Sequence, residues 1–143
     1  MRPLKGAICA VLLALAGLGA AQAQEEDPRV IAVTCDNPRA QAFSMRVAKE
    51  AAQQGQAPRI LLCGAGAELA LRDYEADPLQ AAGAEPQRMM RELMDQGATV
   101  QVCSALLPNT DYTADALVEG VGVASPDEAA ALMADPDVRY FSY

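Results

Sequence analysis

Short apolar runs alternate with amphipathic segments along most of the chain, and this alternation predicts its architecture. Runs of six or seven residues rich in valine, isoleucine and leucine are typical of buried strands. They occur at Arg29–Cys35 (RVIAVTC), Arg59–Gly64 (RILLCG), Ala98–Cys103 (ATVQVC), 118–124 (VEGVGVA) and 138–143. Strands that alternate with helices indicate βα units, so we expect an α/β domain with a mainly parallel sheet covered on both faces.

The helical segments between these runs begin at recognisable capping residues. Asn37 and Pro38 are typical of an N-cap and a first helical turn. The residues expected to form the buried stripe of that helix are Ala40, Phe43, Val47 and Ala51. Further helical segments are expected at 66–72, 87–96, 113–117 and after an N-cap at Ser125. The stretch 73–85 (DYEADPLQAAGAE) has no clear period and is interpreted as an irregular acidic loop.

The first residues have the pattern of a secretory signal. Arg2 and Lys5 precede an apolar stretch at Ala7–Ala20, and Ala21-Gln22-Ala23 forms a small-x-small cleavage site. The apolar stretch is shorter than the roughly 20 residues that span a bilayer. We therefore expect cleavage after Ala23 and a periplasmic protein. The expected signal peptide, flexible lead and folded domain are residues 1–23, 24–28 and 29–143.

Charge narrows the range of partners. The 143-residue chain has a formal net charge of −8, and loss of the two basic leader residues takes it to about −10. Such an acidic surface argues against nucleic acid and anionic lipid as partners. No stretch after the leader is apolar enough to cross a membrane, so we expect no membrane association after cleavage.

The composition also excludes several kinds of enzyme. The chain has no histidine, so neither a Ser-His nor a Cys-His pair is available, and a conventional hydrolase is not expected. The segment 63–68 (CGAGAE) has Gly64 and Gly66 after a strand, but Leu69 stands where a dinucleotide loop needs its third glycine. We interpret this segment as a tight strand-to-helix turn. Neither a dehydrogenase nor any bound cofactor is expected.

Three cysteines remain after removal of the leader: Cys35, Cys63 and Cys103. Each lies at the carboxyl end of a predicted strand, where loops and helix N-termini form the crevice of an open parallel sheet. Neighbouring strands are about 4.8 Å apart, so two such cysteines can come within disulfide reach. An odd number leaves at least one thiol free, paired between chains or used chemically. The sequence leaves the pairing open.

With these features in place, the chain resembles the DsrE/DsrF-like family, also called YchN-like, as an exported branch. The resemblance covers nearly all of 29–143 and rests on RILLCG, on MMRELMDQGATVQVC with its cysteine after Val100-Gln101-Val102, and on GVGVASPDEAAALMADPDV. It implies a three-layer α/β/α sandwich of about five strands that assembles into trimers or hexamers. It also implies that Cys103 takes a sulfane sulfur as a persulfide and passes it to a partner protein.

Three functional hypotheses follow, and the first is favoured. In the first, the protein handles sulfane sulfur or thiols, with Cys103 as the persulfide acceptor and other proteins as sulfur donor and acceptor. In the second, the three thiols form a Cu(I)-binding cluster, aided by methionines such as Met45. In the third, Cys35 and Cys63 form a structural disulfide, Cys103 is buried, and the protein is a non-catalytic oligomeric scaffold. No particular metal ligands are assigned.

Overall fold

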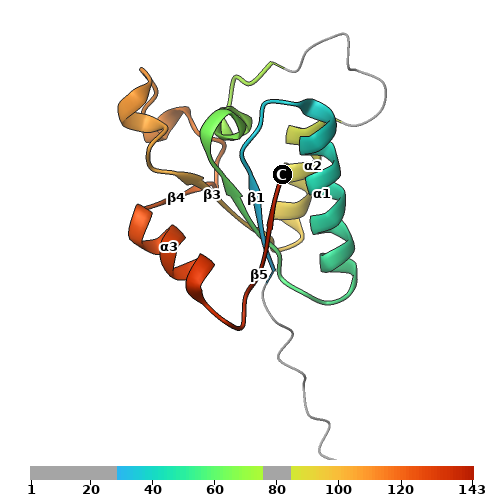
Figure 1. Ribbon diagram of the computed structural model, residues 1–143. Helices are drawn as coiled ribbons and strands as arrows, with labels where there is room; N and C mark the ends of the chain where they lie inside the picture. The colour runs from blue at the N-terminus through green and yellow to red at the C-terminus, as the bar shows by residue number, and fades with distance from the viewer. Residues whose placement is uncertain (1–28, 76–84) are drawn as a thin grey trace, which may run out of the picture.

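The computed structural model describes residues 29–75 and 85–143, and its centre is a parallel sheet (Figure 1). The five strands run in the order β4-β3-β2-β1-β5, and every neighbouring pair is parallel. The strands are β1 (Arg29–Val33), β2 (Arg59–Leu62), β3 (Thr99–Cys103), β4 (Gly122–Ala124) and β5 (Arg139–Ser142). The expected parallel sheet of about five strands is therefore confirmed.

Helices cover both faces of this sheet. The α-helices are α1 (Pro38–Gln53), α2 (Pro86–Asp95) and α3 (Pro126–Ala134), and the 3₁₀ helices are η1 (Gly64–Ala70), η3 (Leu107–Asn109) and η4 (Ala114–Ala116). Helices α1 and α2 lie side by side on one face, and α3 lies on the other (Figure 1). The expected three-layer α/β/α sandwich is confirmed.

The alternation of side chains along each strand builds two apolar layers of unequal size. Ile31 and Val33 face α1 and α2 and belong to the larger core, which is fully buried. Val30 and Leu61 point to the opposite face, where they pack with Leu132 of α3 in a small cluster. The α3 face is therefore covered by a single helix, none of whose own residues is fully buried.

Helix α1 begins where the sequence predicts. The Asn37 side chain accepts hydrogen bonds from the backbone N–H groups of Arg39 and Ala40, at 3.0 and 3.2 Å. These bonds satisfy two of the donors that a helix N-terminus leaves unpaired. Pro38 occupies the first helical position.

The predicted buried stripe of α1 is wrong at Phe43, which is 53% exposed. The buried face includes Met45 together with two polar residues, Gln41 and Ser44. Ser44 can be buried because its hydroxyl donates to the carbonyl of Ala40, at 2.9 Å. Gln41 donates to a backbone carbonyl in the same way. The buried face predicted from hydrophobicity alone therefore differs from the observed one.

The end of β1 and the start of β4 differ from the prediction. Strand β1 ends at Val33, so Cys35 lies in the following loop. Strand β4 is shorter than the predicted 118–124, because the chain turns between Val118 and Val121, where the Val121 N–H donates to the Val118 carbonyl at 3.1 Å. The predicted signal peptide, and most of the predicted acidic loop, fall outside the described residues. Within the described ranges, no helix is long and apolar enough to span a bilayer.

Candidate functional site

Two of the three cysteines meet at the carboxyl edge of the sheet. Strands β2 and β3 pair in register, with Leu62 opposite Val102, so the next residues, Cys63 and Cys103, also lie opposite each other. Their Cα atoms are 5.0 Å apart, and their sulfur atoms form a disulfide. Because paired residues on neighbouring parallel strands point to the same face, the register itself brings the two thiols together.

The disulfide lies on the thinly covered face of the sheet. Both cysteines are half-buried, and both pack against the small apolar cluster beneath α3, which includes Leu61 and Ala124. Both cysteines are therefore partly exposed at the strand ends. This placement distinguishes Cys63 and Cys103 from cysteines sealed in a core, which are inert.

Cys35 is a free, half-buried thiol. The register of β1 and β2 explains why it stays apart. Val33 pairs with Leu62, so Thr34 follows as the neighbour of Cys63, and Cys35 is one residue further along the chain. The hypothesised Cys35–Cys63 disulfide is therefore wrong, because Cys63 is bonded to Cys103. The hypothesis that Cys103 is a buried, unpaired cysteine is wrong for the same reason.

The hypothesised three-thiol cluster for Cu(I) is also not formed. Two of its thiols are joined in the disulfide, and no group of three histidine, cysteine, aspartate or glutamate residues suited to a metal occurs in 29–75 or 85–143. Met45 and Met90 are fully buried in the core between the sheet and helices α1 and α2. The disulfide packs in the separate cluster on the α3 side, so these methionines do not complete a soft-metal site around it.

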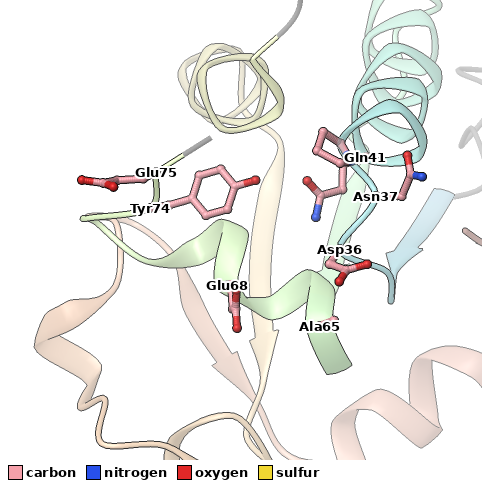
Figure 2. A pocket seen from close by; sticks show the side chains of 8 residues that line it. Asp36, Asn37, Gln41, Ala65, Glu68, Tyr74 and Glu75 are labelled. Atoms are coloured by element: carbon pink, nitrogen blue, oxygen red, sulfur yellow. The ribbon is translucent and has the colours of Figure 1, made fainter. Parts of the chain in front are cut away.

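A second feature of the same edge is a cleft of about 400 Å³. Its walls come from three segments: the loop after β1 with the start of α1, helix η1, and the residues that follow η1. The polar side chains that line it are Asp36, Asn37, Gln41, Glu68, Tyr74 and Glu75. In Figure 2 the Tyr74 hydroxyl and the Gln41 carboxamide point toward each other across the cleft, with Asp36 and Glu68 below them.

The cleft is electronegative and contains an unsatisfied acceptor. Burial raises the pKa of the Tyr74 hydroxyl, and the carboxylates of Glu68, Glu85 and Asp36 raise it further. Gln41 is 1% exposed. Its Nε2 donates to the Cys35 carbonyl at 2.9 Å, but no donor among the described residues reaches its Oε1. A buried acceptor left unpaired costs about 1–3 kcal/mol.

Helix η1 connects the disulfide to the cleft, and its glycines explain how it fits. Cys63 is the residue immediately before η1. Gly64 has a φ of +53°, and a Cβ on Gly66 would lie 2.4 Å from the Val33 carbonyl oxygen. The predicted tight strand-to-helix turn is therefore confirmed, and its glycines let η1 pack directly against the end of β1.

Sequence reasoning placed the cysteines at this edge but missed the cleft. Asp36, Gln41, Glu68 and Tyr74 form no motif, because they come from separate segments that only the fold brings together. No sequence signal pointed to Gln41, because this polar residue lies off the apolar stripe predicted for that helix.

Comparison with known proteins identifies the fold. No protein-family model matches the sequence, and no curated protein sequence matches it significantly. The YchN protein of E. coli has a similar structure, with a TM-score of 0.68 and 18% identity over 82% of this chain and 99% of that chain. A protein of unknown function from Methanobacterium thermoautotrophicum is also similar, with a TM-score of 0.63 and 19% identity over 81% of this chain and 98% of that chain. A conserved protein of unknown function from Bacteroides thetaiotaomicron has a TM-score of 0.60 and 20% identity over 82% of this chain and 95% of that chain.

These similarities define the class of structure. A three-layer domain that aligns over nearly the full length of YchN has a DsrE/DsrF-like, or YchN-like, fold. Identities of 18–20% establish the fold alone. The activity has to be argued from the site.

Proposed function

We propose that this protein is an exported, periplasmic member of the DsrE-like family that handles sulfane sulfur, with Cys103 as the persulfide acceptor. The observation that carries the proposal is the Cys63–Cys103 disulfide at the carboxyl edge of the sheet. The choice of Cys103 rests on the resemblance, which assigns the acceptor role to the cysteine that ends this strand. Because Cys63 lies opposite Cys103, we also assign it a role: it forms the disulfide with Cys103 when no partner protein removes the sulfur.

The loading step starts from the reduced protein. The Cys103 thiolate attacks the outer sulfur of a donor persulfide, R–S–SH, and a new S–S bond forms while the donor's S–S bond breaks. The products are the Cys103 persulfide and the donor thiol R–SH, so atoms and electrons balance. No metal, histidine or cofactor is needed for this exchange.

The loaded persulfide has two fates. A partner protein's thiolate can remove the outer sulfur, which regenerates the Cys103 thiolate. Without a partner, the Cys63 thiolate attacks the Cys103 Sγ and releases HS⁻, and the Cys63–Cys103 disulfide forms. The 5.0 Å separation of the two Cα atoms supports this second path, because it is within the range of disulfide-forming pairs. A dithiol reductant then supplies two electrons and two protons to restore both thiols.

Partners and assembly belong to the same proposal. We expect the donor and the acceptor of sulfur to be proteins. We also expect a homo-oligomer, a trimer or a hexamer, as the resemblance implies. The exposure of Met133 in α3, at 50%, supports an apolar contact on the side of the sheet where the disulfide lies. Light scattering of the purified protein would give the assembly number.

The decisive experiment compares sulfur uptake by the wild type and three cysteine variants. Each protein is expressed with its leader and purified from the periplasm, reduced, freed of reductant and incubated with polysulfide. Its intact mass is then measured. We expect Cys63→Ser to retain an added sulfur atom, because no neighbouring thiol can discharge it. The wild type should instead release sulfide and return to the disulfide.

The controls separate the roles of the cysteines. Cys103→Ser should gain no sulfur, and Cys35→Ser should behave as the wild type. If Cys103→Ser gains as much sulfur as Cys63→Ser, Cys103 is not the acceptor. If Cys63→Ser gains none, the disulfide is structural and the scaffold hypothesis replaces the present one. Failure to recover the mature protein from the periplasm would contradict the proposed export.

A further inference from the structure

The cleft beside η1 contains a buried hydrogen-bond acceptor that the described residues leave unpaired. Gln41 Oε1 is an acceptor with almost no solvent contact and no donor from the described protein, and its carboxamide points across the cleft toward Tyr74 (Figure 2). An unpaired acceptor of this kind is uncommon in folded proteins. It calls for an occupant that carries N–H or O–H donors.

The charges around the cleft determine the sign of that occupant. Asp36, Glu68 and Glu75 are exposed carboxylates on its lining. The N-terminus of α1 contributes only about half a positive charge, and two of its donors are already bonded to the Asn37 side chain. Among the described residues that line the cleft there is no lysine or arginine. A cation is therefore favoured over an anion.

The spacing of the carboxylates points to an organic cation and away from a metal ion. A divalent metal needs several oxygen ligands that converge on one point, and no such group of three occurs in the described ranges. Asp36 and Glu68 come from different elements, the loop after β1 and helix η1, and both line a cleft of about 400 Å³. A flexible chain with ammonium groups at separate positions can pair with each of them.

We propose that this cleft binds a small aliphatic diamine or polyamine. One ammonium group pairs with Asp36 and donates to Gln41 Oε1, and another pairs with Glu68. The Tyr74 ring forms one wall of the cleft, where it is partly buried at the edge of the larger core. A change of its rotamer opens the path from the cleft to Gln41 Oε1, and its hydroxyl can accept a further N–H donor. This site is separate from the disulfide and does not depend on the sulfur chemistry.

The test is calorimetric titration of the mature, disulfide-bonded protein with 1,4-diaminobutane at low salt, with amide chemical shifts followed by NMR. We expect saturable binding with shifts centred on residues 36–41 and 65–75. Glu68→Gln should weaken binding about 10-fold, because one charge-assisted hydrogen bond is lost. Gln41→Met should weaken it by a similar factor. Glu119→Gln, an exposed glutamate outside the cleft, should change it less than about twofold.

The other outcomes overturn the proposal. Absence of saturable binding at diamine concentrations up to about 10 mM, where a ligand of this size is expected to bind a built site, would remove it. Equal weakening by Glu119→Gln would mean a non-specific charge effect. Tighter binding of glutarate, a dianion of similar length, would show that the partial positive charge at the N-terminus of α1 affects binding more than the carboxylates do. Displacement of the diamine by equimolar Mg²⁺ or Ca²⁺ would identify a metal site in its place.

Discussion

Removal of the Cys63–Cys103 disulfide should lower the stability of the domain by a large, calculable amount. The bridge closes a loop with a sequence separation of 40 residues. For a loop of this length, the chain-entropy relation gives about 4 kcal/mol of stabilisation at 25 °C, because the cross-link restricts the unfolded chain. That is a large fraction of the 5–15 kcal/mol by which domains of this size are typically stable.

The assay is urea unfolding of the mature wild type and of the double variant Cys63→Ala/Cys103→Ala, each with and without a phosphine reductant. With a urea m-value of about 1.5 kcal/mol/M, a loss of 4 kcal/mol lowers the midpoint by roughly 2–3 M. Reductant should lower the wild-type midpoint to near that of the double variant. It should leave the double variant itself unchanged.

Cys35→Ala is the matched control, because Cys35 is half-buried but not bonded. Its midpoint should fall only slightly, and reductant should still lower it as in the wild type. An equal midpoint for the wild type with and without reductant would refute the reasoning. It would mean either that the bridge is absent in solution or that the reduced chain loses no constraint.

Three further predictions test the packing of the domain and its charges. Gly66→Ala should destabilise it by about 2–3 kcal/mol, because the added Cβ overlaps the carbonyl of Val33. In the same urea assay Gly122→Ala, whose Cβ meets its nearest neighbour at 3.4 Å, should cost much less. Ser125→Ala should cost about 1 kcal/mol in thermal unfolding, because it removes the capping box of α3. The raised pKa of Tyr74 means that the folded state holds this proton more tightly, so stability present below pH 10.0 is lost as the pH rises through the folded pKa. In a tyrosinate absorbance titration, Tyr74→Phe should lose a component that ionises above pH 10.0.

The order and class of the elements could be predicted from the sequence because each strand is a local apolar run with helical segments between. The parallel sheet and the cap at Asn37 follow from such local patterns. The buried face of α1 could not be predicted in this way, because the burial of Gln41 depends on a hydrogen bond to the carbonyl of Cys35. No periodicity in hydrophobicity reports a bond of that kind.

The disulfide pairing depends on register, which the sequence leaves open. The strand order makes β2 a neighbour of both β1 and β3, so adjacency alone allows either partner for Cys63. The choice is decided by one residue, because Cys103 stands directly opposite Cys63 while Cys35 lies one residue too far along the chain, in the loop after β1. A shift of one residue moves a side chain to the other face of a sheet. The cleft is harder still to predict from the sequence, because its lining comes from three separate segments.

The disulfide and the cleft share helix η1, yet the structure supports each of them separately. The start of η1 is fixed by backbone hydrogen bonds, from Cys63 N–H to the Val33 carbonyl at 2.9 Å and from Gly66 N–H to the Cys63 carbonyl at 3.1 Å. The close contact of Gly66 with β1 adds to them. None of these contacts uses a cysteine sulfur, so reduction of the bridge should leave Glu68 facing the cleft. Loss of sulfur uptake and loss of diamine binding can therefore be assigned to separate sites.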